Sequence, residues 1–212
     1  MTALRLDPLG GAAIVAAAAC LAGLAPQRLL AGASARSAGG PLGAVVASGV
    51  SGLGVYALFA ARGEWEVGCA LGVATACLAA IALVDACVLL IPDLHVLVLA
   101  VLAFVGPLAI DVRTALVGAL VGGGLLWLVA EAFRRVRGVQ GLGFGDVKLM
   151  AALGALTGPV TVLWIVVAAS ILGALWIVGR NGWRIDGSGP APFGAAAALA
   201  AVVFLTLGRL GI

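Results

Sequence analysis

The sequence predicts an all-α membrane protein, a polytopic bundle of about eight transmembrane helices in one domain. Hydrophobic residues make up 64% of the 212 residues and charged residues 10%, whereas a soluble domain carries roughly 25% charged residues. The mean hydropathy is +1.24. At roughly 20 residues per span, a chain of this length holds about eight spans with short loops and has no room for a second, soluble domain.

Eight apolar segments follow one another along the chain. They cover residues 9–31, 42–61, 67–85, 94–110, 114–132, 146–157, 159–179 and 192–210. The sixth is short and is bounded by Asp146 and by Gly158-Pro159, so we expect either a half-helix or a helix that continues, kinked, into the seventh. We divide the single domain (residues 1–212) into two N-terminal spans in residues 1–66 and a six-span core in residues 67–212.

The first segment allows two interpretations. Arg5, a long apolar run and the small residues 31–35 have some of the character of a removable signal peptide. The apolar run is long for a signal, and Asp7 weakens the basic flank. We therefore expect this segment to be retained as the first span.

The distribution of Lys and Arg predicts the orientation of the bundle. The densest cluster, Arg134, Arg135, Arg137 and then Lys148, follows the fifth segment and marks a cytoplasmic loop. When the spans alternate outward from this loop, eight of the 12 basic residues lie inside and four outside. The same alternation places Asp85 and the aspartate of the sixth segment on the cytoplasmic side.

Composition also argues against several kinds of partner. The net charge of +3 is small and dispersed, so we expect no nucleic-acid binding. The four cysteines form no Cys-x-x-Cys pair and His95 is the only histidine, so we expect no zinc site and no other metal or cofactor. The thiols are expected to pack as small buried groups.

Two aspartates are the main candidates for chemistry, because an ionisable group at membrane depth is costly and marks a functional site by default. Asp146 follows Gly141, Gly143 and Gly145 and sits where a helix N-cap is expected. Asp85 closes the third span. Each has a purely structural alternative, which is a capped helix start for Asp146 and a surface carboxylate at a helix end for Asp85.

Together the two patterns resemble those of the type IV prepilin peptidase family, the Gly-x-Gly-Asp class of intramembrane aspartyl proteases. Gly143-Phe144-Gly145-Asp146 matches the class motif, and the run from Gly141 to Lys148 matches its extended form. Asp85 followed by Ile91-Pro92-Asp93 matches the family's first motif. Ala191-Pro192-Phe193-Gly194 resembles a further family signature at the start of the last span.

This resemblance covers about residues 67–210 and implies an aspartic endopeptidase with Asp85 and Asp146 as its catalytic pair. It implies a prepilin or pseudopilin substrate, cut at the cytoplasmic face of the bacterial inner membrane. Larger members of the family carry a cytoplasmic insert with two Cys-x-x-Cys pairs, linked to methylation of the new N-terminus. The chain lacks this insert between its early spans, so we expect a short form without methyltransferase activity.

The chemistry of two neighbouring carboxylates predicts a shared water and a shared proton, because both cannot ionise cheaply. The helix dipole favours a charged Asp146 at a helix N-terminus and a neutral Asp85 at a helix C-terminus. On this ground we expect Asp146 to act as base and Asp85 as acid.

Four further residues are predicted to position the substrate or the loop: Gly143, Gly145, Asp93 and Lys148. The glycines allow a backbone that pairs with an extended substrate. Asp93 has a structural alternative as a plain helix N-cap after Pro92. Lys148 has one as a topology signal.

Two other functions stay open at this point: a proton- or cation-coupled transporter, and a non-catalytic component of pilus or secretion assembly. Transporters also use intramembrane carboxylates and broken helices. The sequence shows no inverted repeat, and both aspartates lie near one surface rather than at the midplane, so the peptidase is favoured. The lipid bilayer is an expected partner, and the sequence does not define the oligomeric state.

Overall fold

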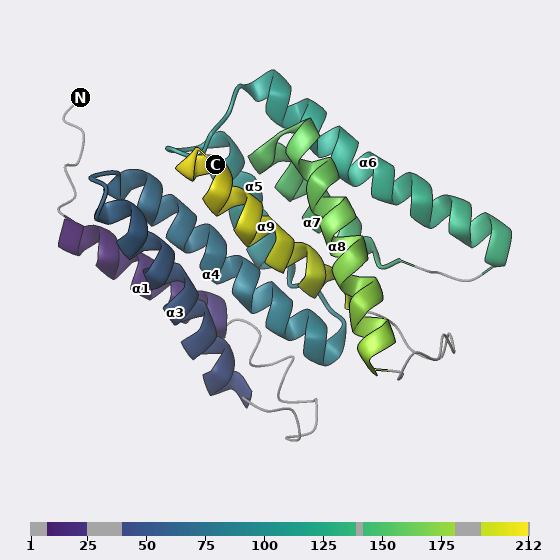
Figure 1. Ribbon diagram of the computed structural model, residues 1–212, viewed down its shortest axis with the longest axis horizontal. Helices are drawn as coiled ribbons and strands as arrows, with labels where there is room; N and C mark the ends of the chain where they lie inside the picture. Colours follow the sequence, from purple (N-terminus) through teal and green to yellow (C-terminus); the bar gives the residue numbers. More distant parts are fainter. Residues whose placement is uncertain (1–7, 25–39, 139–141, 181–191, 212) are drawn as a thin grey trace.

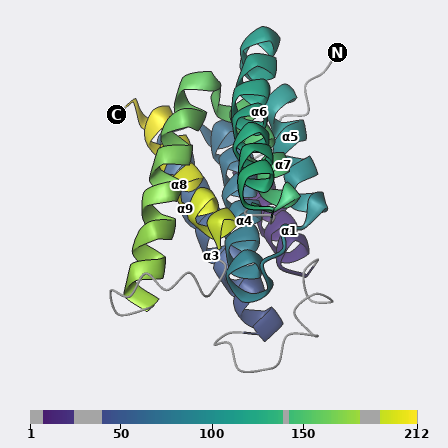
Figure 2. The same cartoon turned by 90° about the vertical axis from the view of Figure 1, so that its right-hand side faces the viewer.

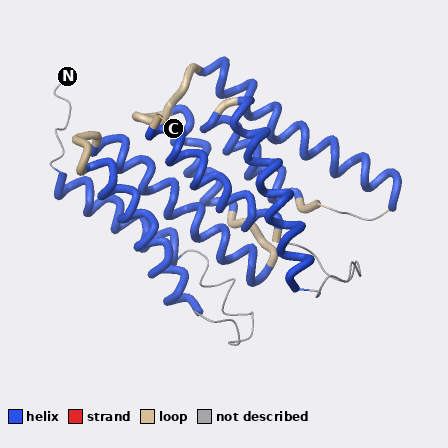
Figure 3. Tube along the Cα trace, viewed as in Figure 1, coloured by secondary structure: helices blue, strands red, loops and turns tan. Residues whose placement is uncertain are grey.

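The computed structural model describes residues 8–24, 40–138, 142–180 and 192–211, and all regular secondary structure within these ranges is helical (Figures 1 and 3). The helices are α1 (Pro8–Leu24), α3 (Gly40–Ala60), α4 (Trp65–Val88), α5 (Asp93–Phe104), α6 (Val112–Arg137), α7 (Phe144–Thr157), α8 (Pro159–Arg180) and α9 (Phe193–Leu210). The predicted all-α fold is confirmed. Arg5, the small residues 31–35, Gly141 and Ala191 lie outside the described residues.

The helices differ in length. Within the described residues, four helices are long and apolar enough to cross a membrane by length and composition: α4, α6, α8 and α9. The helices α5 and α7 have only 12 and 14 residues, so they extend about 18 and 21 Å against a hydrocarbon core of about 30 Å. Because these two helices are shorter than the long helices of the bundle, their ends, with the polar backbone groups found there, lie within the depth of the bundle.

The sixth segment is a separate short helix. It ends at Gly158, whose φ of +84° lies in the left-handed region that favours glycine. The helix α8 begins at Pro159, which has no amide hydrogen to continue the preceding helix. Of the two expectations for this segment, the short helix is therefore the one observed, rather than a kinked continuation into α8.

Consecutive helices run in opposite directions, so that their ends alternate between the two ends of the bundle (Figures 1 and 2). The helix α4 is central and packs against α1, α3, α5 and α9, and its Leu71, Leu78 and Ile81 are fully buried. The end of α4 lies at the same end of the bundle as the starts of α5, α7 and α9 (Figure 1). This is the end at which the site forms.

The position of α7 is fixed by backbone contact with α6. A Cβ added to Gly118 of α6 would overlap the carbonyl oxygen of Gly154 of α7, and a Cβ on Gly154 would overlap that of Gly118. Small residues allow helices in lipid to approach this closely. The contact holds α7, and with it the Asp146 in its first turn, against a long helix.

Candidate active site

Asp85 occupies the last turn of α4 and is 5% exposed. The helix ends at Val88, and the next residue, Leu89, adopts a left-handed conformation (φ 57°) and donates its amide hydrogen to the Asp85 carbonyl oxygen at 2.9 Å. The Asp85 side chain accepts a hydrogen bond from the backbone N–H of Ala195, with 2.8 Å between N and Oδ2. Burial of a carboxylate is costly unless donors of this kind replace water.

The amide that binds Asp85 belongs to the first turn of α9. The N-cap residue of this helix is Pro192, whose side chain makes no capping hydrogen bond. The first amides of a helix have no partner within the helix and need an acceptor from elsewhere. Asp85 supplies that acceptor from another helix, so it caps α9.

This arrangement differs from the expectation drawn from α4 alone. Asp85 lies at the C-terminal end of its own helix, which disfavours its charged form. It also faces the N-terminus of α9, whose positive dipole end and free amides favour the charged form. The local field at Asp85 is thus set by two helices, and only one of them was considered in the sequence argument.

Asp146 lies in the first turn of α7 but not at its N-cap. The N-cap is Gly143 and Asp146 is the third residue of the helix. Its Oδ2 accepts the backbone N–H of Gly143 at 3.2 Å, and its own amide donates to the Gly143 carbonyl oxygen at 3.2 Å. The expectation that Asp146 is the N-cap is therefore wrong, because the N-cap lies three residues earlier. The Asp146 side chain still accepts a hydrogen bond from a backbone amide at the start of the helix.

Ile91 links the two aspartate-bearing segments. A Cβ added to Gly145 would lie 3.2 Å from Ile91 Cβ. A Cβ added to Gly194 would lie 2.8 Å from Ile91 Cδ1 and 3.1 Å from Asp85 Cγ. One isoleucine side chain thus fills the space between the glycine before Asp146 and the glycine beside Asp85, which brings three distant sequence motifs to one place.

The electrostatics of Asp146 depend on its burial and on the nearby charge of Asp85. Asp146 lies outside the four helices of membrane-spanning length. Its pKa is raised from 3.8 to about 6, first by burial and then by the negative charge of Asp85, while the Gly143 hydrogen bond opposes the rise. The pKa departs from the helix-dipole expectation, because burial and a neighbouring carboxylate outweigh the dipole. Asp146 therefore holds a proton to higher pH than an ordinary aspartate.

Asp93 and Lys148 form an ion pair, with 3.0 Å between Oδ1 and Nζ. Asp93 is the first residue of α5, whose N-cap is Pro92, so its expected role as N-cap is displaced by one residue. The Lys148 ammonium also lies 5.3 Å from the centre of the Phe144 ring. An exposed pair of this kind adds little stability, but it joins the start of α5 to the first turn of α7.

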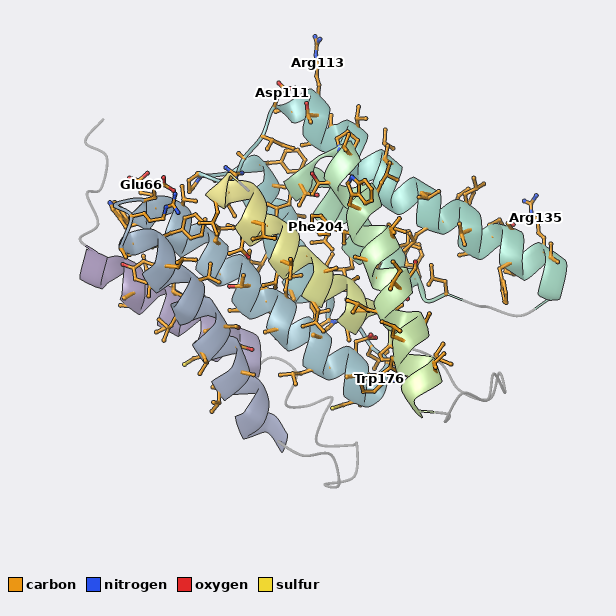
Figure 4. The ribbon with its side chains drawn as sticks, in the orientation of Figure 1. Glu66, Asp111, Arg113, Arg135, Trp176 and Phe204 are labelled. Atoms are coloured by element: carbon orange, nitrogen blue, oxygen red, sulfur yellow. The ribbon has the colours of Figure 1, made fainter. Side chains whose placement is uncertain are left out.

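Other charged side chains lie at the periphery. Figure 4 labels Glu66, Asp111, Arg113 and Arg135, and all four are exposed at helix ends. Among the described residues, no group of three or more His, Cys, Asp or Glu side chains could hold a metal ion. The buried carboxylate of Asp85 is thus unlike these surface charges.

Three residues at the site were not among the predicted site residues: Ile91, Gly194 and Ala195. Ile91 and Gly194 belong to recognised motifs, but their contact with each other and with the Asp85 side chain had no signal in the sequence. The available signal for Ala195 was a helix start at Pro192 that lacks a capping side chain. A helix start of this kind requires an acceptor from another segment.

A buried carboxylate beside a second one of raised pKa is the arrangement of an aspartic hydrolytic site, set here among membrane helices. Comparison with known sequences gives the family. The sequence model of the type IV leader peptidase family matches residues 72–178, and the chain belongs to this family. The matched stretch contains Asp85 and Asp146 and ends before α9.

Several curated relatives are named "Prepilin leader peptidase/N-methyltransferase". The one from Xanthomonas campestris pv. campestris is 39% identical over 54% of this chain and 42% of its own length. The one from Pseudomonas aeruginosa is 36% identical over 68% of this chain and 51% of its own length. The chain thus matches about half or less of each of these two relatives. No solved structure matches the chain.

Proposed function

We propose that this protein is an intramembrane aspartyl endopeptidase that cleaves the leader peptide from type IV prepilins or pseudopilins. The observation that carries the proposal is that Asp85 and Asp146, which come from different helices, lie near enough for the charge of Asp85 to raise the pKa of Asp146. Family membership and the printed names of the relatives support the substrate class. They also support a multi-pass membrane location.

In the proposed mechanism the pair binds one water and holds one proton. Asp85, whose Oδ2 is held by the Ala195 amide, is the carboxylate that takes a proton from the water. Asp146 is the protonated partner that polarises the scissile carbonyl. The resulting hydroxide adds to the carbonyl carbon, the C–N bond of the tetrahedral intermediate breaks, and the leaving amine receives a proton from the pair.

These roles are the reverse of those expected from the helix dipoles. Two observations favour the reversal: the amide of α9 stabilises a charged Asp85, and the raised pKa of Asp146, about 6, favours its protonated form to higher pH than in an ordinary aspartate. Because the two groups are coupled, the pKa values seen in kinetics belong to the pair.

The proposed site faces the cytoplasm from the bacterial inner membrane. The basic cluster at the end of α6 supports this orientation, because Arg134 and Arg135 are exposed at the end of the bundle that carries the pair. A leader peptide on the cytoplasmic side of a membrane helix would reach carboxylates placed there. Gly143, Gly145, Asp93 and Lys148 keep their proposed roles in positioning, and no methyl transfer is proposed for this chain.

The test is cleavage of a prepilin in proteoliposomes by the wild type and by Asp85→Asn and Asp146→Asn. The matched control is Asp111→Asn, because Asp111 is exposed, caps α6 by accepting the Thr114 amide at 3.2 Å, and lies away from the pair. Asparagine is also a good N-cap, so this control should cleave normally. Both site variants should insert and fold yet fail to cleave. Cleavage by either one would remove that aspartate from the mechanism.

A further inference from the structure

A groove of about 490 Å³ opens between α3 and α8 and has α4 and α9 as its floor. Its lining is apolar apart from Ser51 of α3, and Trp176 of α8, labelled in Figure 4, forms part of one wall. None of the catalytic roles assigned above uses it.

The part of the floor formed by α4 has the spacing of a single helix face. It consists of Ala79, Ala82, Leu83 and Ala86, at positions i, i+3, i+4 and i+7. Three of these four residues are alanine. Alanine side chains are short, so a stripe of them lets the backbone of another helix approach closely.

The part formed by α9 repeats the same spacing. Pro192, Ala195, Ala196 and Leu199 line the groove, again at i, i+3, i+4 and i+7. Two parallel stripes, each about two turns or about 11 Å long, make a trough with the shape of a helix. Recognition of a helix in a groove uses this geometry.

The outer surface of the bundle is different. The helix α6 presents Leu116, Leu120 and Leu128, all exposed, and long side chains of this kind suit contact with lipid tails. Small residues do not favour contact with lipid tails, whereas they are typical of surfaces against which another helix packs. The composition of the trough therefore favours a helix over acyl chains as its occupant.

The trough adjoins Asp85, one member of the proposed catalytic pair. Ala195 lines it and donates its amide hydrogen to Asp85. Ala86, the residue after Asp85, also lines it. On α9, Gly194 faces Asp85 while its neighbour Ala195 faces the trough. The end of the trough at Ala86 and Ala195 therefore lies next to the residue that bears one carboxylate of the proposed pair.

We propose that this trough between α3, α4, α8 and α9 holds the apolar membrane helix of the peptide substrate. The inference rests on the proposed function and adds to it the surface that recognises the substrate. The helix lies against the two alanine stripes, and the residues before it extend past the start of α9 to the carboxylates.

The first experiment narrows the trough by Ala82→Phe and measures cleavage of a full-length prepilin in proteoliposomes. The matched control is Ala57→Phe, because Ala57 is an exposed alanine of α3 that does not line the groove. We expect Ala82→Phe to raise KM by roughly tenfold, the cost of about 1.4 kcal/mol of lost binding, and the control to resemble the wild type. Equal KM values for the two variants would overturn the proposal.

A second experiment does not depend on a bulky substitution. A single cysteine replaces Ala79, or Ala57 as control, in a background without the four native cysteines and with Asp146→Asn to prevent cleavage. Disulfide formation is then measured against cysteines scanned through the substrate helix. We expect cross-links from position 79 with a helical period and none from position 57. Cross-linking that is equal at both positions, or absent at both while the wild type cleaves, would reject the trough alone. A wild type that cleaves no prepilin would reject the proposed function as well.

Discussion

The carboxylate of Asp85 accepts the backbone N–H of Ala195 at 2.8 Å, a hydrogen bond between residues 110 positions apart in the chain. It makes Asp85 the cap of α9 as well as a member of the carboxylate pair. The start of α9 and the proposed chemistry of the site therefore depend on the same side chain.

We expect Asp85→Asn and Asp85→Ala to separate the two roles of Asp85, which are the proposed catalysis and the capping of α9. Asparagine keeps an oxygen that accepts the Ala195 amide, whereas alanine leaves that buried amide without an acceptor. Both variants should fail to cleave. Only the alanine variant should lose stability, by about 1 kcal/mol as for other lost N-caps. Thermal unfolding followed by tryptophan fluorescence measures the difference, and equal melting temperatures would show that Asp85 does not stabilise α9.

The raised pKa of Asp146 predicts that cleavage activity falls as the pH rises. Its pKa is about 6 rather than 3.8, so the pair keeps its proton up to about pH 6 and loses it above. We expect kcat/KM to decline as pH rises through this range. By linkage, the contribution of Asp146 to stability is fully present below pH 3.8 and is lost as pH rises through about 6. A rate that stays constant from pH 5 to 8 would contradict a requirement for the protonated form.

The charge of Asp85 is the second cause of this raised pKa, after burial. In Asp85→Asn the pKa of Asp146 should fall, but it should remain above its ordinary value because burial persists. The infrared absorption of the protonated carboxyl group, followed against pH and assigned with Asp146→Asn, measures this change. An unchanged pKa in Asp85→Asn would mean that the two carboxylates do not interact.

The Asp93–Lys148 ion pair is expected to position the site rather than stabilise the fold. Asp93→Lys or Lys148→Asp places like charges where Oδ1 and Nζ are now 3.0 Å apart, which should push α5 away from the first turn of α7 and lower kcat. The double exchange should restore kcat. The control is the same exchange of Glu131 and Arg135, a pair at 2.7 Å within α6, which should leave cleavage unchanged. A double exchange as slow as the single variants would exclude positioning by this pair.

Gly194 is expected to tolerate no side chain. A Cβ there would lie 2.8 Å from Ile91 Cδ1 and 3.1 Å from the Asp85 carboxylate, so Gly194→Ala should displace Asp85 and lower kcat. Ile91→Val removes Cδ1 and should partly restore activity in the double variant. Gly208→Ala is the control, because it lies in the same helix with nothing within 4 Å of the added Cβ. Full activity of Gly194→Ala would show that the packing around Asp85 is not critical.

The sequence by itself determined the local features of this protein. Hydropathy located the apolar segments, and each of the eight corresponds to a described helix. Glycine and proline at 158 and 159 located the break between α7 and α8, because both act on their own backbone. The two aspartates were visible because a carboxylate within an apolar segment is costly, and this cost can be read from the neighbouring residues.

Only the tertiary structure decided what surrounds those carboxylates. The amide that holds Asp85 comes from Ala195, and the ion pair of Lys148 from Asp93; neither has a local signal. The helix-dipole argument considered each helix alone, so it left out the α9 amide at Asp85 and the burial and neighbouring charge that raise the pKa of Asp146. Electrostatic fields and burial depend on distance in space rather than in sequence, so these contributions appear only once α9 packs against α4 and α7 packs against α9.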